Sequence, residues 1–499
     1  MTKARLLGAV AMAACLYAGA SLAQDMPLRI VLPSEPADID ACNTTVSNIG
    51  IIIKENIVET LTTLNGETSE VEPRLATGWT DLGNGTWRVT LRDGVTFHDG
   101  APFTAEAVAK AIDRLESEAI ACRDRTKIRG IDLTTAVVDD RTIDITANPP
   151  QVLMPTLLSF IGVGSPGTPA DALSRAPVGT GPMTFVSWDS AGISVAANEG
   201  YWGEKPAFDR ALYIFRGESA LRASMVEIGE ADIAVDIAPQ DAVDPATDIA
   251  FLNGETTRIR MVMKPPLDDI RVRKAMNLAF DREALVGTLL SDKVLLSSQY
   301  FLPKINGYNP DLKVWPYDPE QARALIDEAR ADGVPVDQEL RLVGRIGFYP
   351  NEPEVLQALQ QMWAAIGLNV KVEMMESAEW LKLANKPYAE DRPAMLIQEM
   401  HDNNNGDAAF TMQFRYHSTG QQSEMAVPEI DALLEKALAA TGEDRTRAFQ
   451  EANRIIADEI VPAVPMYHMV SYMRVGERVG YMPNSLSGSL IELADIKPK

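Results

Sequence analysis

Histidine is scarce in this sequence: 499 residues include four of them, His98, His401, His417 and His468. A zinc-type metal centre or a histidine general base therefore has few candidate residues. The sequence also lacks a P-loop, a G-x-S-x-G nucleophile motif and an H-E-x-x-H metal motif. We therefore expect a protein without enzyme activity, cofactor or metal site. A hydrolase that uses two carboxylates is the alternative, because Asp and Glu are abundant.

Positive charge is in deficit. The chain has 46 basic and 70 acidic residues, a net charge of −24 at pH 7. Nucleic-acid binding depends on basic patches that neutralise phosphates. The charge balance therefore argues against a nucleic-acid partner.

Long apolar runs are confined to the N-terminus. Lys3 and Arg5 precede an apolar stretch over residues 6–20, and Ser21-Leu22-Ala23 supplies the small residues of a signal-peptidase site. We expect a cleaved signal peptide over residues 1–23 and export to the periplasm. A lipoprotein anchor at Cys15 is the alternative, but the apolar run continues past this residue. No later segment has the roughly 20 apolar residues that a membrane helix needs.

Cysteine is rare as well. Of three cysteines, Cys42 and Cys122 lie after the predicted cleavage site. In an oxidising compartment a lone pair is more often bridged than free, and two thiols without nearby histidines are a poor metal site. We predict a structural disulfide between Cys42 and Cys122.

One apparent nucleotide motif is set aside. Residues 162–167 spell G-x-G-x-x-G, but Pro166 falls where a helix should begin to donate backbone N–H groups. We expect a loop there.

The rest of the chain has the pattern of a mixed α/β protein. We expect a buried strand over 27–33, helices over 49–61, 104–115, 320–331 and 354–366, a hairpin turning at Asn84-Gly85, and a strand over 369–374. Helix followed by strand is typical of an α/β domain. About 475 mature residues exceed the usual size of one core, which favours two large lobes.

Five segments, in order along the chain, carry a resemblance to a known family. They are residues 72–76 (EPRLA), 87–105 (WRVTLRDGVTFHDGAPFTA), 177–182 (PVGTGP), 198–202 (NEGYW) and 269–276 (DIRVRKAM). Together they resemble the peptide/nickel class, family 5, of ABC-transporter solute-binding proteins, which includes dipeptide and oligopeptide binders. His98 lies inside one of these segments and is expected to be structural.

The resemblance implies a fold and a partner. The fold is the two-lobed α/β periplasmic-binding-protein fold (type II, Venus-flytrap) with an extra subdomain in the first lobe. Lobe I would comprise residues 24–258 and 476–499, with the subdomain over about 60–177, and lobe II residues 259–475. A monomer would close on its solute and deliver it to the permease of the importer in the inner membrane. Strands over 257–263 and 471–475 would connect the lobes.

The resemblance also implies an anchor for the ammonium group of a peptide. Residues 401–410 resemble the segment in which family members hold this group on an aspartate, and Asp402 matches best. A buried ammonium needs a fixed carboxylate to offset its desolvation. The chain lacks the proline that usually follows and has an extra asparagine, so Asp407 is the alternative. A turn that only satisfies its own backbone is another.

Other ligand contacts follow from the same comparison. Arg345, in a segment with Tyr349 that is similar to the family's arginine-containing turn, could clamp a carboxylate with two hydrogen bonds, or form a surface ion pair. Asn43 and Thr44 would contribute neutral hydrogen bonds from lobe I, and Met400 and His401 would line the wall beside Asp402. The expected solute is a di- or tripeptide or a peptide-like compound. A nickel-metallophore complex, an opine, an oligosaccharide or a glutathione-like compound is the alternative.

Overall fold

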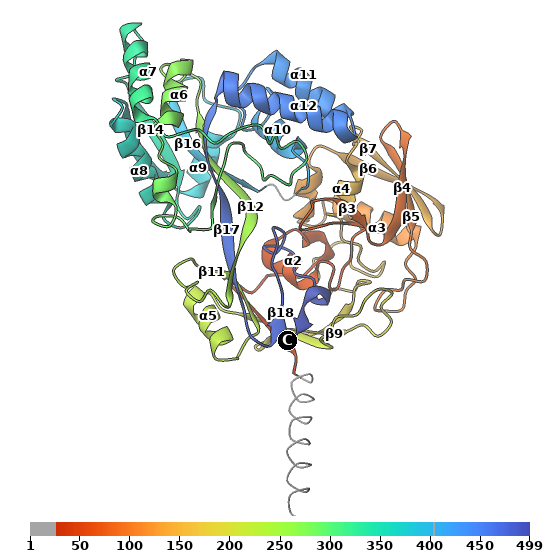
Figure 1. Cartoon of the computed structure of the whole chain (residues 1–499). Coiled ribbons are helices and arrows are strands. Elements are labelled where there is room, and N and C mark those ends of the chain that lie inside the picture. Colours follow the sequence, from red (N-terminus) through yellow and green to blue (C-terminus); the bar gives the residue numbers. More distant parts are fainter. Residues whose placement is uncertain (1–25, 403–404) are drawn as a thin grey trace, which may run out of the picture. The chain divides into compact units, whose positions relative to one another are not determined.

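The computed structural model describes residues 26–402 and 405–499, so the predicted signal peptide lies outside the described part. The chain forms two compact units (Figure 1). Within the described part of the chain, unit 1 comprises residues 26–63, Val71–Ile249 and Ser471–Lys499, and unit 2 comprises Leu64–Glu70 and Ala250–Val470. The chain changes units within β12 (Asp248–Met261) and again within β17 (Ala463–Val475), which are neighbouring strands of one sheet.

The main sheet of unit 1 is built around a fully apolar strand. All residues of β1 (Leu28–Leu32) except Arg29 are buried, which confirms the buried strand predicted over 27–33. β1 has parallel neighbours on both sides, and strands of parallel sheets are normally covered on both faces by other elements. From β11 to the edge, the strands beside β1 are β11 (Ile233–Ile237), β10 (Arg210–Phe215), β9 (Gly192–Ala197) and β8 (Met183–Asp189).

A second, antiparallel sheet of unit 1 contains the predicted hairpin. Asn84 and Gly85 have positive φ angles of 53° and 80°, as a tight turn requires. Val89 and Leu91 are buried against α3 (Ala105–Glu116), which Thr104 precedes as N-cap. This confirms both the hairpin and the helix predicted over 104–115. The strand order is β4 (Ala76–Gly83), β5 (Thr86–Leu91), β7 (Thr142–Asn148) and β6 (Asp132–Asp139).

The helix predicted over 49–61 is shorter than expected. It ends at Ile53 as α2 (Ser47–Ile53), and Glu55 then adopts a positive φ of 59°. The backbone of Gly179 approaches this turn so closely that a Cβ atom on it would lie 1.9 Å from the carbonyl oxygen of Ile57. Tertiary packing against the PVGTGP segment therefore overrides the helical pattern after Ile53.

Short elements complete unit 1. Two of them, β2 (Thr62–Leu64) and β3 (Val71–Pro73), lie at the two ends of residues 64–70, which belong to unit 2. Residues 162–167 form a loop, as predicted. The other short elements are η1 (Ala41–Asn43), η2 (Asp124–Ile128), α4 (Met154–Leu158), α5 (Ser219–Glu227), β18 (Val479–Gly480), η5 (Leu493–Asp495) and β19 (Lys497–Pro498).

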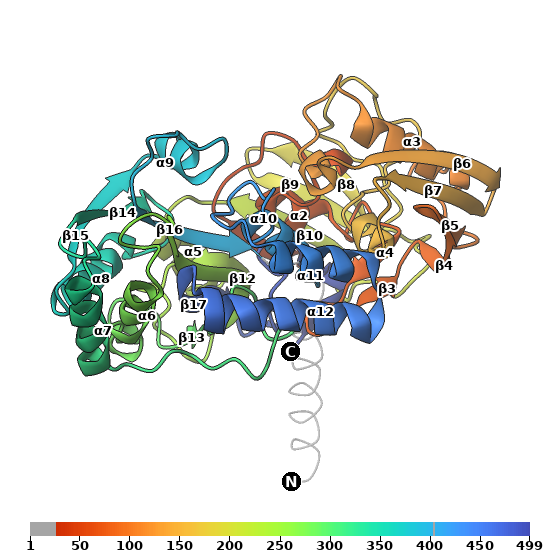
Figure 2. The same cartoon turned by 90° about the horizontal axis from the view of Figure 1, so that it is seen from above.

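Unit 2 places a mixed sheet between two layers of helices. Figure 2 shows α9 (Ser377–Ala384) on one side of the sheet and α6, α7 and α8 on the other. The sheet order is β15 (Asn369–Met375), β14 (Glu339–Arg345), β16 (Met395–Asp402), β12 and β17, and the helices are α6 (Ile270–Leu278), α7 (Pro319–Ala331) and α8 (Glu352–Ala364).

Capping signals in unit 2 act as predicted. The Asp318 carboxylate accepts a 2.9 Å hydrogen bond from the Gln321 N–H at the start of α7, and Gly333 ends the turn after it with a φ of 85°. Gly367, with a φ of 89°, separates α8 from β15. The helix-to-strand unit predicted over 354–374 is therefore confirmed.

A second core of unit 2 is helical. Phe301, Met412 and Phe449 are among its fully buried residues. None of the described helices is long and apolar enough to cross a membrane. The remaining elements of unit 2 are η3 (Glu283–Leu285), β13 (Leu295–Leu296), α10 (Ala409–Arg415), α11 (Pro428–Ala439), α12 (Gly442–Arg454) and η4 (Ile455–Ile460).

Candidate functional site

The carboxyl ends of parallel strands in unit 2 form the candidate site. β14 pairs in parallel with β15 on one side and with β16 on the other. Arg345 is the last residue of β14 and Asp402 is the last residue of β16. Open α/β sheets bind ligands beyond the carboxyl ends of their strands. The fold thus brings the two residues that we predicted as anchors to the same edge of one sheet.

Arg345 lies on an aromatic platform. Its guanidinium carbon is 3.6 Å from the ring centroid of Phe348 and 5.5 Å from that of Trp380. The guanidinium makes no hydrogen bond or ion pair with any side chain or backbone group that the structure describes. Burial lowers the pKa of Arg345, although Glu352 and Glu255 oppose this shift. The two rings therefore hold the guanidinium in place, and its N–H groups can still donate hydrogen bonds to a ligand.

Several buried arginines of unit 2 are paired with carboxylates, whereas Arg273 and Arg282 donate to backbone carbonyl oxygens. Glu399, opposite Arg258 on the neighbouring strand, lies 2.7 Å from Arg258 Nη2, 3.0 Å from Arg260 Nε and 2.8 Å from Arg415 Nη1. Burial alone would raise the pKa of Glu399, but the three arginines together lower it to about 2. These ion pairs keep Glu399 ionised and connect β12, β16 and the helix at Ala409–Arg415.

Met400 and His401 directly precede Asp402 in β16. Asp402 pairs with Glu255 of β12, and its side chain lies outside the described part. His401 is buried, with Nε2 3.0 Å from Thr411 Oγ1 and its ring 5.3 Å from the ring of Phe410. Met400 packs against the core between the sheet and α8. The expectation that these three residues contact the solute stays a prediction.

Asp407 is engaged inside unit 2. Its carboxylate lies 2.7 Å and 2.8 Å from two nitrogens of Arg445 and accepts a 2.8 Å hydrogen bond from Asn306 Nδ2. It also accepts a hydrogen bond from the Ala409 N–H. The oxygens of the Asp407 carboxylate already accept hydrogen bonds from residues of unit 2. This favours Asp402 as the anchor of the solute's ammonium group.

We expect Asp407→Asn to lower the free energy of unfolding by about 2 kcal/mol, because Arg445 loses its buried partner. Peptide affinity of the folded variant should not change. Asp402→Asn is the matched variant and should show the reverse, with weaker binding at normal stability. Urea unfolding and calorimetry measure the two effects. A folded Asp407→Asn variant that has lost peptide binding would exchange the roles of the two aspartates.

Tyr349 lies between the candidate site and the core of unit 2. It packs against the core cluster of unit 2, and its buried hydroxyl makes no hydrogen bond with any described residue. Burial and the nearby Glu352 raise its pKa. A direct contact of Tyr349 with solute stays a prediction.

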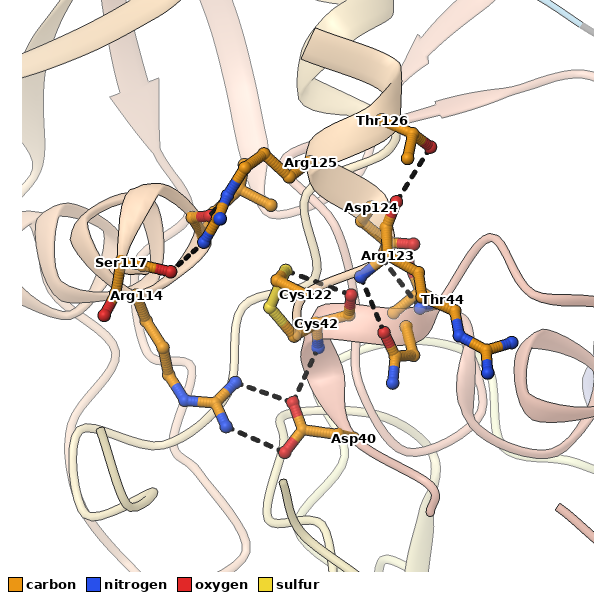
Figure 3. Close-up of a disulfide and its surroundings, with 12 residues drawn as sticks. Asp40, Cys42, Thr44, Arg114, Ser117, Cys122, Arg123, Asp124, Arg125 and Thr126 are labelled. Carbon is orange, nitrogen blue, oxygen red and sulfur yellow. Dashed lines mark hydrogen bonds and ion pairs between the residues drawn. A yellow bond between two sulfur atoms is a disulfide. The ribbon is translucent and has the colours of Figure 1, made fainter. Parts of the chain in front are cut away.

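The residues that we predicted in unit 1 surround the disulfide. The structure contains the Cys42–Cys122 disulfide, which confirms that prediction (Figure 3). The Asn43 side chain donates to Asp38 and accepts from the Arg123 N–H, and Thr44 donates two 2.7 Å hydrogen bonds to Asp124. The hydrogen bonds of Asn43 and Thr44 thus serve the fold of unit 1. Their contact with solute stays a prediction.

Residues beside the disulfide also line a cavity in unit 1. Its volume is about 460 Å³, and the loop over residues 162–166 forms part of its wall. Asp124 faces it but is saturated by Thr44 and Thr45; burial raises the pKa of Asp124 to about 6 against these hydrogen bonds. Arg114 faces it too but is held by Asp40 at 2.6 Å.

Metal ligation has no support in the described ranges. They contain no group of three or more His, Cys, Asp or Glu side chains that could hold a metal ion. His468, which lies 2.8 Å from Thr256 Oγ1, is buried, and its burial lowers its pKa to about 4. The His98 Nε2 atom lies 2.9 Å from the Gly181 carbonyl oxygen, a contact in keeping with the expected structural role.

A family model decides the class of the protein. The model for bacterial extracellular solute-binding proteins, family 5, matches residues 70–423. The chain belongs to this family. This family 5 protein is therefore the extracytoplasmic solute-binding protein of an ABC importer. The family is not enzymatic, so the hydrolase alternative is set aside.

Two curated relatives cover most of the family 5 protein. The dipeptide-binding protein of Escherichia coli (strain K12) is 24% identical over 470 residues, covering 86% of this chain and 87% of the relative. Heme-binding protein A of Haemophilus influenzae is 27% identical over 455 residues, covering 83% and 82%. The two names show that members with different ligands share this scaffold.

A solved structure supports the fold. HbpA2 from Haemophilus parasuis matches with a TM-score of 0.83 at 22% identity, covering 95% of this chain and 100% of that chain. The α/β periplasmic-binding-protein fold expected from the sequence is confirmed.

Sequence reasoning missed several residues of the site. Phe348 and Trp380 form the platform of Arg345, and Glu352 lies beneath it. The aromatic residues follow β14 and β15 and could have been found by listing what lies just past each predicted strand. Glu352 carried no such signal, because a glutamate at the first position of a helix is common and normally exposed.

Proposed function

We propose that the protein captures a di- or tripeptide, or a peptide-like solute with separated charges, for an ABC importer. Arg345 holds the carboxylate of the solute and Asp402 holds its ammonium group. The observation that carries the proposal is the contrast between Arg345, whose guanidinium has no carboxylate partner among the described side chains, and the paired arginines around Glu399 and Asp407.

The spacing of the two anchors supports a short solute. Beyond the register pair Val343↔Ile397, Arg345 lies two residues further along its strand and Asp402 five. The offset of three residues corresponds to about 10 Å. An extended chain of two to three residues spans about 7 to 10 Å. The separation of the anchors is therefore of the order of a short peptide with free ends.

The chemistry of the anchors favours a zwitterion. A guanidinium can donate two parallel hydrogen bonds to a carboxylate, and the rings below Arg345 keep its plane fixed. An ammonium group transferred out of water needs a carboxylate in return. Acidic overall charge does not select for either end, because it is spread over the surface of a 499-residue chain.

The transport cycle follows from the family. The solute binds, the two lobes expected from the sequence close on it, and the permease of the importer accepts the loaded form. Only a difference in free energy between the loaded and empty forms is needed for selective docking. The closure and the permease contact are parts of the proposal.

Native mass spectrometry of protein purified from its own cells tests the solute class. We expect an added mass that corresponds to one short peptide, released intact by acid. The alternatives give different masses: a nickel complex shows the isotope pattern of the metal, an oligosaccharide shows sugar increments, and an opine or glutathione-like compound shows its own formula. Any of these at full occupancy, with no peptide, would replace the proposed solute.

A further inference from the structure

Glu352 is a buried carboxylic acid directly beneath the proposed carboxylate clamp. It is the first residue of α8 and is 1% exposed. Its Oε1 atom accepts a 3.0 Å hydrogen bond from the backbone N–H of Arg345. A Cβ atom on Gly344 would lie 3.0 Å from the same oxygen. The carboxyl group is thus packed against the backbone at the end of β14.

The carboxyl group of Glu352 joins the two ends of the turn over residues 345–352 through its hydrogen bond with the Arg345 N–H. Gly347 and Asn351 have positive φ angles of 74° and 61°, and the turn carries Phe348, the ring under Arg345. The Phe348 N–H donates a 3.2 Å hydrogen bond to the Arg345 carbonyl oxygen, and its proximity to the Glu352 carboxylate lowers the pKa of Glu352. Glu352 therefore fixes both the end of the strand and the platform on which the guanidinium lies.

The charged and titratable groups around Glu352 are few. Arg345 faces it from β14, and Tyr349 faces it from the turn, with Tyr467 of β17 behind Tyr349. The negative charge of Glu255 on β12 also raises the pKa of Arg345, as that of Glu352 does. The Oε2 atom of Glu352 is buried and makes no hydrogen bond with the described residues. Among the described residues, Arg345 is the cation whose charge acts on this carboxylate.

Burial raises the pKa of Glu352 from its ordinary value near 4.5 to about 7, against the opposing effects of the Arg345 N–H hydrogen bond, the Arg345 charge and the nearby Phe348 N–H. Glu399 provides the contrast, because three arginines keep it ionised at the same depth. Glu352 therefore changes its charge within the physiological range, and it does so beside Arg345.

We propose that Glu352 is a positioning residue that couples solute affinity to pH. Protonated, it leaves the charge of Arg345 to the carboxylate of the solute; ionised, it competes for that charge and repels the solute carboxylate. Binding then takes up part of a proton onto Glu352, and the protein holds its solute more tightly below pH 7 than above it. The inference rests on the proposed role of Arg345 as a carboxylate clamp.

Calorimetry of one tripeptide between pH 5.5 and 8.5 tests the coupling in the wild type and in the isosteric variant Glu352→Gln. Wild-type affinity should fall by about tenfold as pH rises through 7. The variant should bind about as tightly as the wild type at pH 5.5 and should lack the fall in affinity around pH 7. The amino terminus of the peptide titrates near pH 8 in both experiments, so the ratio of the two affinities at each pH isolates Glu352.

A proton count gives a second measurement that needs no variant. Titrations in buffers with different ionisation enthalpies should show fractional proton uptake on binding at pH 7 in the wild type, and in Glu352→Gln only the roughly tenth of a proton that the peptide amino terminus takes up. Without solute, the wild type should lose stability relative to the variant as pH rises from about 4.5 to about 7, because the folded state binds the proton more tightly than the unfolded chain.

The outcomes separate the two proposals. If the wild type and Glu352→Gln share one pH profile and the wild type takes up no more than the peptide amino terminus accounts for, the coupling is wrong while Arg345 remains the clamp. If Arg345→Ala binds the tripeptide as the wild type does, the clamp itself is wrong, and the coupling falls with it. If Glu352→Gln does not fold, the proton count of the wild type decides.

Discussion

Arg345→Ala should bind di- and tripeptides at least about a hundredfold more weakly than the wild type, a loss of about 3 kcal/mol or more. Alanine removes the hydrogen bonds to the solute carboxylate and leaves that carboxylate without a partner in the site. The fold should be unaffected, because the guanidinium makes no hydrogen bond with the described residues. Calorimetry with one tripeptide measures the affinity, and thermal unfolding verifies the fold.

A peptide amide provides the control for this prediction. Amidation of the carboxyl terminus should weaken binding to the wild type by a similar factor and should cause little further loss in Arg345→Ala, since both changes remove the same interaction. Arg341→Ala is the matched variant, because Arg341 lies on the same strand in a surface ion pair with Glu373, 2.8 Å away. Additive losses for amide and variant would show that Arg345 does not contact the carboxylate.

Removal of the Cys42–Cys122 disulfide should lower the free energy of unfolding by about 4.5 kcal/mol. The two cysteines are 80 residues apart in sequence, so the bridge strongly restricts the unfolded chain. In the folded state it connects η1 to the segment of η2, where Thr44 donates to Asp124 (Figure 3). The Asn43 side chain also accepts a hydrogen bond from the Arg123 N–H. The double variant Cys42→Ala/Cys122→Ala, unfolded in urea, measures this loss.

Reduction of the wild type is the control for the disulfide. A reducing agent should shift the unfolding of the wild type to that of the double variant and should leave the double variant unchanged. If the two proteins differ by less than about 1 kcal/mol, the bridge does not carry the stability of unit 1 that chain entropy predicts.

Local signals in the sequence predicted the parts of the fold that depend on neighbouring residues. The apolar run of β1, the Asn84-Gly85 turn and the Asp318 cap each specify their own geometry. The helix after Ile49 failed as a prediction because its end depends on Gly179, which is more than 120 positions away and packs its backbone against Ile57. The spacing of apolar residues over 49–61 does not indicate this contact with Gly179.

The candidate site was predictable in position and less so in detail. The resemblance pointed to the ends of two strands, and the structure places Arg345 and Asp402 at one sheet edge. The resemblance could not show that Asp407 forms an ion pair with Arg445, because the two residues are 38 positions apart in the sequence. It also could not show that Glu352 is buried, since a glutamate at the start of a helix is usually exposed.

The central claim is that this protein binds a short peptide and returns it unchanged. Titration calorimetry with a panel of di- and tripeptides, followed by chromatography of the recovered ligand, tests it most directly. We expect one peptide per protein, with the peptide recovered intact. If no peptide produces heat or raises the melting temperature while a sugar, opine or metal complex does, this protein does not capture peptides; if the recovered peptide has been cleaved, the protein does not return it unchanged.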